Sequence, residues 1–137
     1  MNAVDSSVVI AGFASWHEQH GRARAALETG PHLIAHCALE SYAVLTRLPA
    51  PHRASSAIVT EYLRAQFPSD PLSLAIPAIT LVEELCALGI SGGAVYDGLI
   101  AVTARSHHAT LFTLDRRAEA IYTRCGTNFV NISEIRR

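Results

Sequence analysis

Three of the four aspartates in this chain stand where an acidic side chain is costly unless it has a chemical role. Asp5 ends an apolar N-terminal run, Asp115 ends the apolar run 110–114, and Asp97 lies inside the largely apolar segment 93–104. An ionised carboxylate that is withdrawn from water needs a compensating positive charge. The chain contains no lysine that could supply it. Clustered acids without an ammonium partner indicate a bound divalent cation, and hence metal-dependent phosphate chemistry.

A fourth acid, Glu40, interrupts the apolar helical segment 38–45. Residues three or four positions away share a helix face, and around both Glu40 and Asp97 these neighbours are mostly apolar. The segment 94–107 is apolar nearly all round, so we expect it to be a central, buried helix. Neither acid is at a helix end, where it could act as a cap. Asp5 and Asp115, by contrast, can equally be caps of the helices that follow them.

Short apolar strands and helical segments alternate along the whole chain. The predicted strands are 1–5, 33–35, 72–76 (at an edge), 109–114 and 129–132. The predicted helices are one that follows Ser6-Ser7, then 17–28, 37–48, 53–67, 77–88, 94–107 and 116–124. This alternation predicts an α/β fold of three layers, in which helices cover both faces of a central, mainly parallel sheet of four to five strands. Ligands of such sheets bind beyond the carboxyl ends of the strands, where Asp5 and Asp115 stand.

Length and composition restrict the class of protein. A chain of 137 residues is expected to form a single domain over residues 1–137. Its net charge of −1 argues against a nucleic-acid coat protein that binds through overall basic charge. No apolar run is long enough to cross a bilayer, and the N-terminus lacks the pattern of a signal peptide, so we expect a cytoplasmic location. The three widely spaced cysteines are interpreted as small buried apolar residues.

Two adjacent cations follow the last aspartate. Arg116 and Arg117 open the helix predicted at 116–124. Cations at a helix N-terminus oppose the helix dipole, which makes sense if they face an anionic substrate. Two solvated arginines would satisfy the sequence equally well, and the pattern does not choose between these readings.

Other acid-pocket and nucleophile chemistries lack their required residues. Receiver domains and haloacid-dehalogenase phosphatases need a lysine beside the acids. A P-loop needs Gly-Lys-Ser/Thr, which the segment 91–93 does not provide, and Ser6 and Ser7 lack the G-x-S-x-G context of a hydrolase nucleophile. The close histidine pairs at 17/20 and 107/108 are interpreted as solvated. Trp16 and Tyr42 are interpreted as core or interface residues rather than as platforms for bases.

These residues together resemble the PIN-domain nucleases, and more narrowly the VapC-type toxins of toxin–antitoxin modules. The resemblance rests on Asn2-Ala-Val-Asp5-Ser-Ser, Glu40, Tyr96-Asp97-Gly-Leu-Ile-Ala101 and Ala109-Thr-Leu-Phe-Thr-Leu-Asp115, and it covers essentially the whole chain. The segment from Tyr96 to Arg117 is its most specific part. Gly98 stands where the family often has alanine, and Leu114 where many relatives have a polar residue.

The resemblance implies a PIN-like fold and an endoribonuclease that uses Mg²⁺ or Mn²⁺. It implies that Asp5, Asp97 and Asp115 hold the ion, that Glu40 contributes, and that the hydroxyls of Ser6 and Thr113 support the site. It further implies a cognate VapB-like antitoxin that inserts a segment into the acidic groove, and a homodimer. Arg116 and Arg117 would then bind the phosphates of the RNA. Two other functions remain open, namely a metal nuclease acting on DNA or flap-like substrates, and a non-catalytic module that binds RNA or protein.

Overall fold

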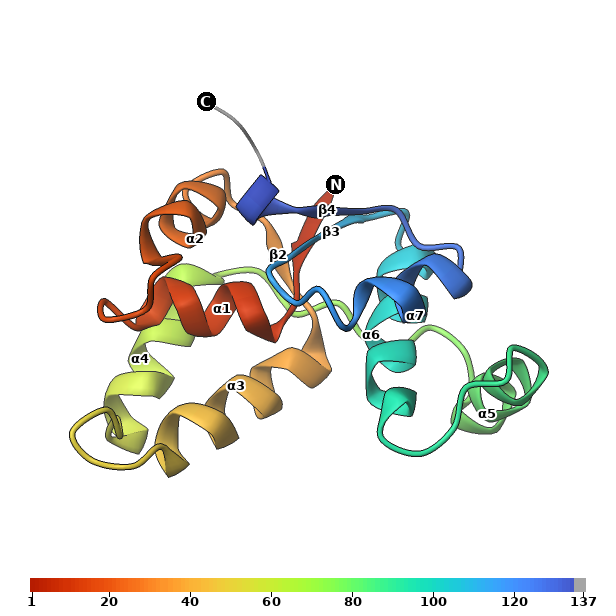
Figure 1. Cartoon of the computed structure of the whole chain (residues 1–137), viewed down its shortest axis with the longest axis horizontal. Coiled ribbons are helices and arrows are strands. Elements are labelled where there is room, and N and C mark those ends of the chain that lie inside the picture. The colour runs from red at the N-terminus through yellow and green to blue at the C-terminus, as the bar shows by residue number, and fades with distance from the viewer. Residues whose placement is uncertain (135–137) are drawn as a thin grey trace.

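Strands and helices alternate in the computed structural model, which describes residues 1–134 (Figure 1). The order is β1 (Asn2–Val4), α1 (Ser6–Phe13), α2 (His20–Leu27), β2 (His32–Leu33), α3 (Ala35–Arg47), α4 (Ser56–Gln66), α5 (Ala78–Ala87), α6 (Ala94–Ser106), β3 (Thr110–Thr113), α7 (Glu119–Arg124), β4 (Phe129–Asn131) and the 3₁₀ turn Ile132–Glu134. The predicted α/β class is therefore confirmed. No helix in this part of the chain combines the length and the apolar character that crossing a membrane requires.

The four strands form one sheet in the order β2-β1-β3-β4, and every neighbouring pair is parallel. Right-handed crossovers in such a sheet place the helices that lead from β1 to β2 on one face and those that lead into β3 and β4 on the other. Figure 1 shows this arrangement, with α1 and α2 on one side of the strands and α6 and α7 on the other. The chain leaves β1 in one direction and later returns to β3 on its other side. The carboxyl ends of β1 and β3 therefore flank the point where the sheet order reverses, which is where α/β sheets bind ligands.

The predicted edge strand at 72–76 reduces to a single bridge. Leu72 pairs with the residues around Ile34, donating its N–H to Leu33 O and accepting from Ala35 N, both at 2.8 Å. No further ladder forms among the residues that follow, so the sheet has four strands, within the predicted range. The segment 73–77 carries the chain towards α5 instead.

Three helices begin three residues later than their sequence pattern predicts. α2 begins at 20 instead of 17, α4 at 56 instead of 53, and α7 at 119 instead of 116. Turns occupy the residues before α2 and α7, whereas residues 53–55 before α4 are neither turn nor helix. Before α4, the hydroxyl of Ser55 accepts a hydrogen bond of 3.3 Å from Ile58 N, and this cap fixes the start of the helix.

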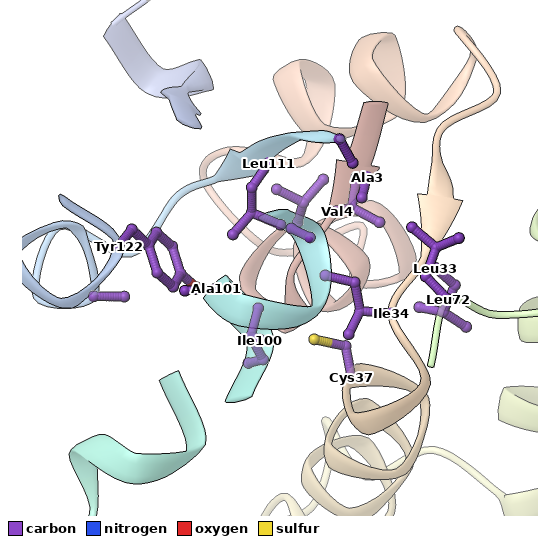
Figure 2. Packing of buried hydrophobic residues seen from close by; sticks show 14 of the residues in the cluster. Ala3, Val4, Leu33, Ile34, Cys37, Leu72, Ile100, Ala101, Leu111 and Tyr122 are labelled. Atoms are coloured by element: carbon purple, nitrogen blue, oxygen red, sulfur yellow. The ribbon is translucent and has the colours of Figure 1, made fainter. Parts of the chain in front are cut away.

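The buried helix α6 lies at the centre of the core, as predicted. Its residues Gly98 and Ile100 to Ala104 are all buried. Figure 2 shows Ile100 and Ala101 close to Leu111 of β3, with the ring of Tyr122 beside Ala101. Cys37 and Cys125 are buried as predicted, whereas the interpretation of Cys86 was wrong, because that side chain is exposed on α5. The core thus fixes α6, and with it Asp97, against the sheet.

Candidate active site

Asp5 lies at the carboxyl end of β1, directly beside β3. Its N–H donates to Phe112 O at 3.2 Å, which extends the β1–β3 register by one residue and brings Asp5 level with Thr113. Asp5 is also the N-cap of α1, and its Oδ1 accepts hydrogen bonds from Ser7 N at 3.0 Å and Val8 N at 3.4 Å. The carboxyl group is 2% exposed, and burial raises its pKa above the ordinary value. The cap and the site acid are therefore the same residue.

Hydroxyl groups connect Asp5 to the end of β3. The hydroxyl of Ser7 donates a short hydrogen bond to Asp5 Oδ1, and its oxygen accepts from Leu114 N at 2.8 Å. Thr113 Oγ1 lies 3.5 Å from the Ser7 hydroxyl and accepts from Asp115 N at 3.0 Å. This network orders the turn that carries Asp115. Thr113 therefore lies where the resemblance places a supporting hydroxyl.

The hydroxyl that reaches Asp5 belongs to Ser7, a residue that the sequence reading did not assign to the site. Ser6, which the resemblance assigned, has a buried side-chain oxygen without a hydrogen-bond partner among the described residues. Tyr122 was also missed, although its hydroxyl donates to Asp5 Oδ2 at 2.7 Å. Ser7 has a local signal in its spacing from the capping Asp5. Tyr122 has none, because its contact depends on how α7 packs.

Asp97 and Glu40 approach the same site from α6 and α3. The pKa of Asp97 is raised to about 6, first by burial and then by the negative charges of Asp115, Glu40 and Asp5, while His36 acts in the opposite direction. All three other acids thus act on Asp97 through space, although they are far apart in the sequence. Like charges at short range disfavour ionisation of one another, which is the behaviour of a shared acidic site.

The ion pairs in the described part of the chain do not neutralise this cluster. Arg105 pairs with Glu84 at 2.7 Å, away from the four acids. His36 Nε2 lies 3.6 Å from Glu40 Oε2, and this contact was not anticipated from the sequence. The other three acids, Asp5, Asp97 and Asp115, take part in neither pair.

The residues present fit a hydrated divalent cation. Carboxylate oxygens are the donors that Mg²⁺ and Mn²⁺ prefer. Within residues 1–134, no three His, Cys, Asp or Glu side chains are already arranged as a set of metal ligands. Mg²⁺ does not require such a set, because it retains several waters and binds protein through one or two carboxylates. The donor types and their uncompensated charge therefore suit this ion better than one that needs a closed ligand cage.

A groove of about 670 Å³ begins at the edge of the acidic site. Its lining includes Ser7, Asp115, Arg116 and Arg117, together with His17 and Gln19 from the turn before α2. The two arginines lie in the turn before α7 and not in its first helical turn, so the predicted opposition to the helix dipole was wrong. Arg117 N instead donates to Asp115 Oδ1 at 3.0 Å. Both arginines are exposed and line this groove.

Several other sequence candidates lie outside the acidic site. His20 Nδ1 contacts Ala11 O and His107 Nε2 contacts Ser73 O, each at 2.8 Å, so these rings have structural partners. Trp16 is 49% exposed and Tyr42 38% exposed, so neither belongs to the core.

Comparison with known proteins places this fold and site in a family. The PIN domain family matches residues 3–123. Ribonuclease VapC40 of Mycobacterium tuberculosis is 47% identical over 125 residues, which cover 90% of this chain and 93% of that protein. Ribonuclease VapC27 of the same organism is 35% identical over 132 residues, which cover 93% of this chain and 94% of that protein.

Two solved structures share the fold at low sequence identity. FitAcB from Neisseria gonorrhoeae superimposes with a TM-score of 0.74 at 18% identity, over 98% of this chain and 100% of that one. FitAB bound to an IR36 DNA fragment superimposes with a TM-score of 0.73 at 17% identity, over 100% of this chain and 99% of that one. With the sequence matches across most of their length, the chain belongs to the PIN-domain family, among its VapC-type members.

Proposed function

We propose that this protein is a metal-dependent endoribonuclease toxin that hydrolyses RNA phosphodiester bonds and is neutralised by a cognate antitoxin. The observation that carries the proposal is that Asp5, Glu40, Asp97 and Asp115 approach one another from separate parts of the chain, closely enough that the other three act on the pKa of Asp97. The names of the two curated relatives support ribonuclease activity.

Asp5 and Asp97 are the first candidates to hold Mg²⁺, with Mn²⁺ as a substitute, and Asp115 completes the acidic set. When bound, the cation polarises the scissile phosphate and makes a water molecule more acidic. Glu40 accepts the proton of the attacking water, since its side chain is 39% exposed and accessible from solvent. Water adds to phosphorus in line as the bond to the leaving oxygen breaks.

Other residues of the chain position the reacting groups. The hydroxyls of Ser7 and Tyr122 hold one carboxylate oxygen each, so Asp5 keeps a single orientation. Thr113 fixes the turn before Asp115. Arg116 and Arg117 bind phosphates of the strand along the groove, and such contacts set register without reading sequence.

The proposed function includes two protein partners, an antitoxin and a second copy of this chain. An antitoxin segment occupies the acidic site, and the protein forms a homodimer. Large exposed aliphatic side chains support protein–protein contacts, because soluble monomers rarely leave many of them uncovered. They are Ile79 and Val82 on α5, Leu39 on α3 and Ile58 on α4.

The test is cleavage of an unstructured RNA and of a DNA of matched sequence by the purified protein, with Mg²⁺, Mn²⁺ or EDTA. Asp97→Asn should abolish cleavage, whereas Asp70→Asn, an exposed aspartate in a loop, should cleave like the wild type. Cleavage of DNA but not RNA would favour a DNA nuclease, and metal-independent or absent cleavage would contradict the proposal. In cells, expression should arrest growth, and the product of the neighbouring small gene should restore it.

A further inference from the structure

An exposed tyrosine forms a stacked pair with a histidine at the edge of the acidic site. The rings of Tyr96 and His36 are nearly parallel, with centroids 5.4 Å apart and an interplanar angle of 7°. Tyr96 is 56% exposed. The two rings are offset, so His36 lies against part of one face of Tyr96 and the exposed area is mainly elsewhere on the ring. An aromatic ring held flat in this way is a preformed stacking surface.

The pair is in direct contact with the acids. His36 Nε2 lies 3.6 Å from Glu40 Oε2. Tyr96 immediately precedes Asp97 at the start of α6. Neighbouring residues of a helix point in different directions, so the link between the rings and the acids is His36. It stacks on Tyr96, approaches Glu40 and acts on Asp97 through its charge.

We propose that Tyr96, supported by His36, stacks an unpaired nucleobase of the substrate next to the scissile phosphate. The inference rests on the proposed function, because it assumes a single-stranded nucleic acid at the acids. In a nucleotide only the sugar separates the base from its phosphate, so a base on this ring holds its phosphate near Asp97. Stacking on aromatic rings is a general means of binding unpaired bases, since every base has a flat face.

The surroundings favour a base over a protein side chain at this position. The acids beside the rings lie close enough for their charges to disfavour one another, so the site attracts a phosphate only once a cation is bound. A neutral base contributes binding energy without adding to that repulsion.

Binding without cleavage separates this inference from the proposed function. The probe is a fluorescein-labelled, unstructured RNA octamer, compared with a labelled octamer of the same ribose–phosphate backbone without bases. Affinity is measured by anisotropy with Ca²⁺ in place of Mg²⁺. Tyr96→Ala should weaken binding of the RNA on the order of ten-fold. The same variant should bind the abasic backbone like the wild type.

Two further variants make the result specific. Tyr96→Phe keeps the ring and should restore RNA binding, because the hydroxyl of Tyr96 has no hydrogen bond within the described residues. Tyr42→Ala removes an exposed tyrosine on α3 that is two residues from Glu40 and so faces a different direction. It should bind both probes like the wild type.

Cleavage kinetics give a second readout. Tyr96→Ala should raise KM for RNA on the order of ten-fold and change kcat much less. Equal affinity of Tyr96→Ala and wild type for the RNA would overturn the inference, as would an equal loss on the abasic probe. If Tyr96→Ala lost only self-association or antitoxin binding, the surface would be a protein interface and the inference would also fall. A wild type that binds RNA through Tyr96 but does not cleave it would contradict only the proposed function.

Discussion

The hydroxyl of Tyr122 donates a hydrogen bond of 2.7 Å to Oδ2 of Asp5, joining residues 117 positions apart. Both side chains are almost fully buried. Burial, and then the adjacent Asp5 carboxylate, raise the pKa of Tyr122 above its ordinary value, so the phenol stays protonated and remains a donor. Hydrogen bonds of this kind favour the charged carboxylate against the effect of burial. Helix α7 thus orients Asp5 and offsets part of the effect of burial on its pKa.

Tyr122→Phe should lower the free energy of unfolding by about 1–3 kcal/mol, because it leaves a buried carboxylate oxygen without its donor. RNA cleavage should fall as well, since Asp5 loses its fixed orientation. Tyr62→Phe is the matched control, because it removes a hydroxyl that donates to Val9 O at 2.8 Å, away from the acids. It should lose stability but retain activity. Chemical denaturation measures the stability of both variants, and cleavage assays measure their activity. Equal cleavage activity of Tyr122→Phe and Tyr62→Phe would contradict the role of Tyr122.

Ser7→Ala and Ser6→Ala should have opposite effects. Ser7→Ala removes the hydroxyl that connects Asp5 to Leu114 N. It should lower the free energy of unfolding by about 1–2 kcal/mol and remove most of the cleavage activity. Ser6→Ala removes a buried oxygen without a partner, so its stability should be unchanged or higher. Thermal unfolding and cleavage assays on both variants check this. Loss of activity in Ser6→Ala alone would support the assignment that the family resemblance suggests.

Asp97→Asn should change how stability depends on pH in the metal-free protein. The folded-state pKa of about 6 lies above the ordinary 3.8. The stabilising contribution of protonated Asp97 is therefore complete below about 3.8 and is lost as the pH rises through about 6. Wild type should lose about 1–2 kcal/mol over this range relative to Asp97→Asn, after screening of a partly exposed carboxylate.

The measurement is urea unfolding with EDTA at several pH values from 4 to 8. The difference between wild type and Asp97→Asn isolates this residue from other titrating groups. Mg²⁺ should remove the difference at pH 7 by compensating the charge. Parallel stability profiles for the two proteins would contradict a repulsive acid cluster.

Gly98→Ala should destabilise the protein by about 1–2 kcal/mol. An added Cβ would lie 2.6 Å from Leu85 Cδ2, and the strain of overpacking a core exceeds the gain in helix propensity. Leu85→Val in the same chain should recover part of the loss, because it removes the atom that the added Cβ would meet. The control is Gly21→Ala in α2, which meets no atom within 4 Å and should be stabilising. Calorimetry should show the lowest stability for Gly98→Ala, a higher one for Gly98→Ala with Leu85→Val, and the highest for Gly21→Ala.

The sequence predicts the parts of the site that depend on position along a single element. An aspartate after an apolar strand predicts Asp5 and Asp115 at the sheet edge, and an acid within an apolar helix predicts Asp97 in the interior. The family resemblance adds RNA as the expected substrate, which no periodicity could indicate.

The sequence does not predict contacts that depend on packing between elements. Ser7 can be distinguished from Ser6 only once Asp5 is taken as the N-cap of α1, whose carboxylate reaches the residue two positions on. Tyr122 reads as an ordinary core residue, and His36 becomes a site residue only because α3 meets α6. The starts of α2 and α7 were misplaced where turns precede the helix, because the ends of a helix are its least well defined part.

The central claim is that acids from distant parts of the chain form one cation site. Binding of Mn²⁺, followed by electron paramagnetic resonance of the free ion, tests it without requiring any substrate. Wild type and Asp70→Asn should bind Mn²⁺ with the same affinity. Asp5→Asn and Asp97→Asn should each bind it at least about ten-fold more weakly, because even residues that only support a metal ligand typically cost that much affinity when they are replaced. Unchanged Mn²⁺ affinity in Asp97→Asn, in a protein that remains folded, would contradict the account.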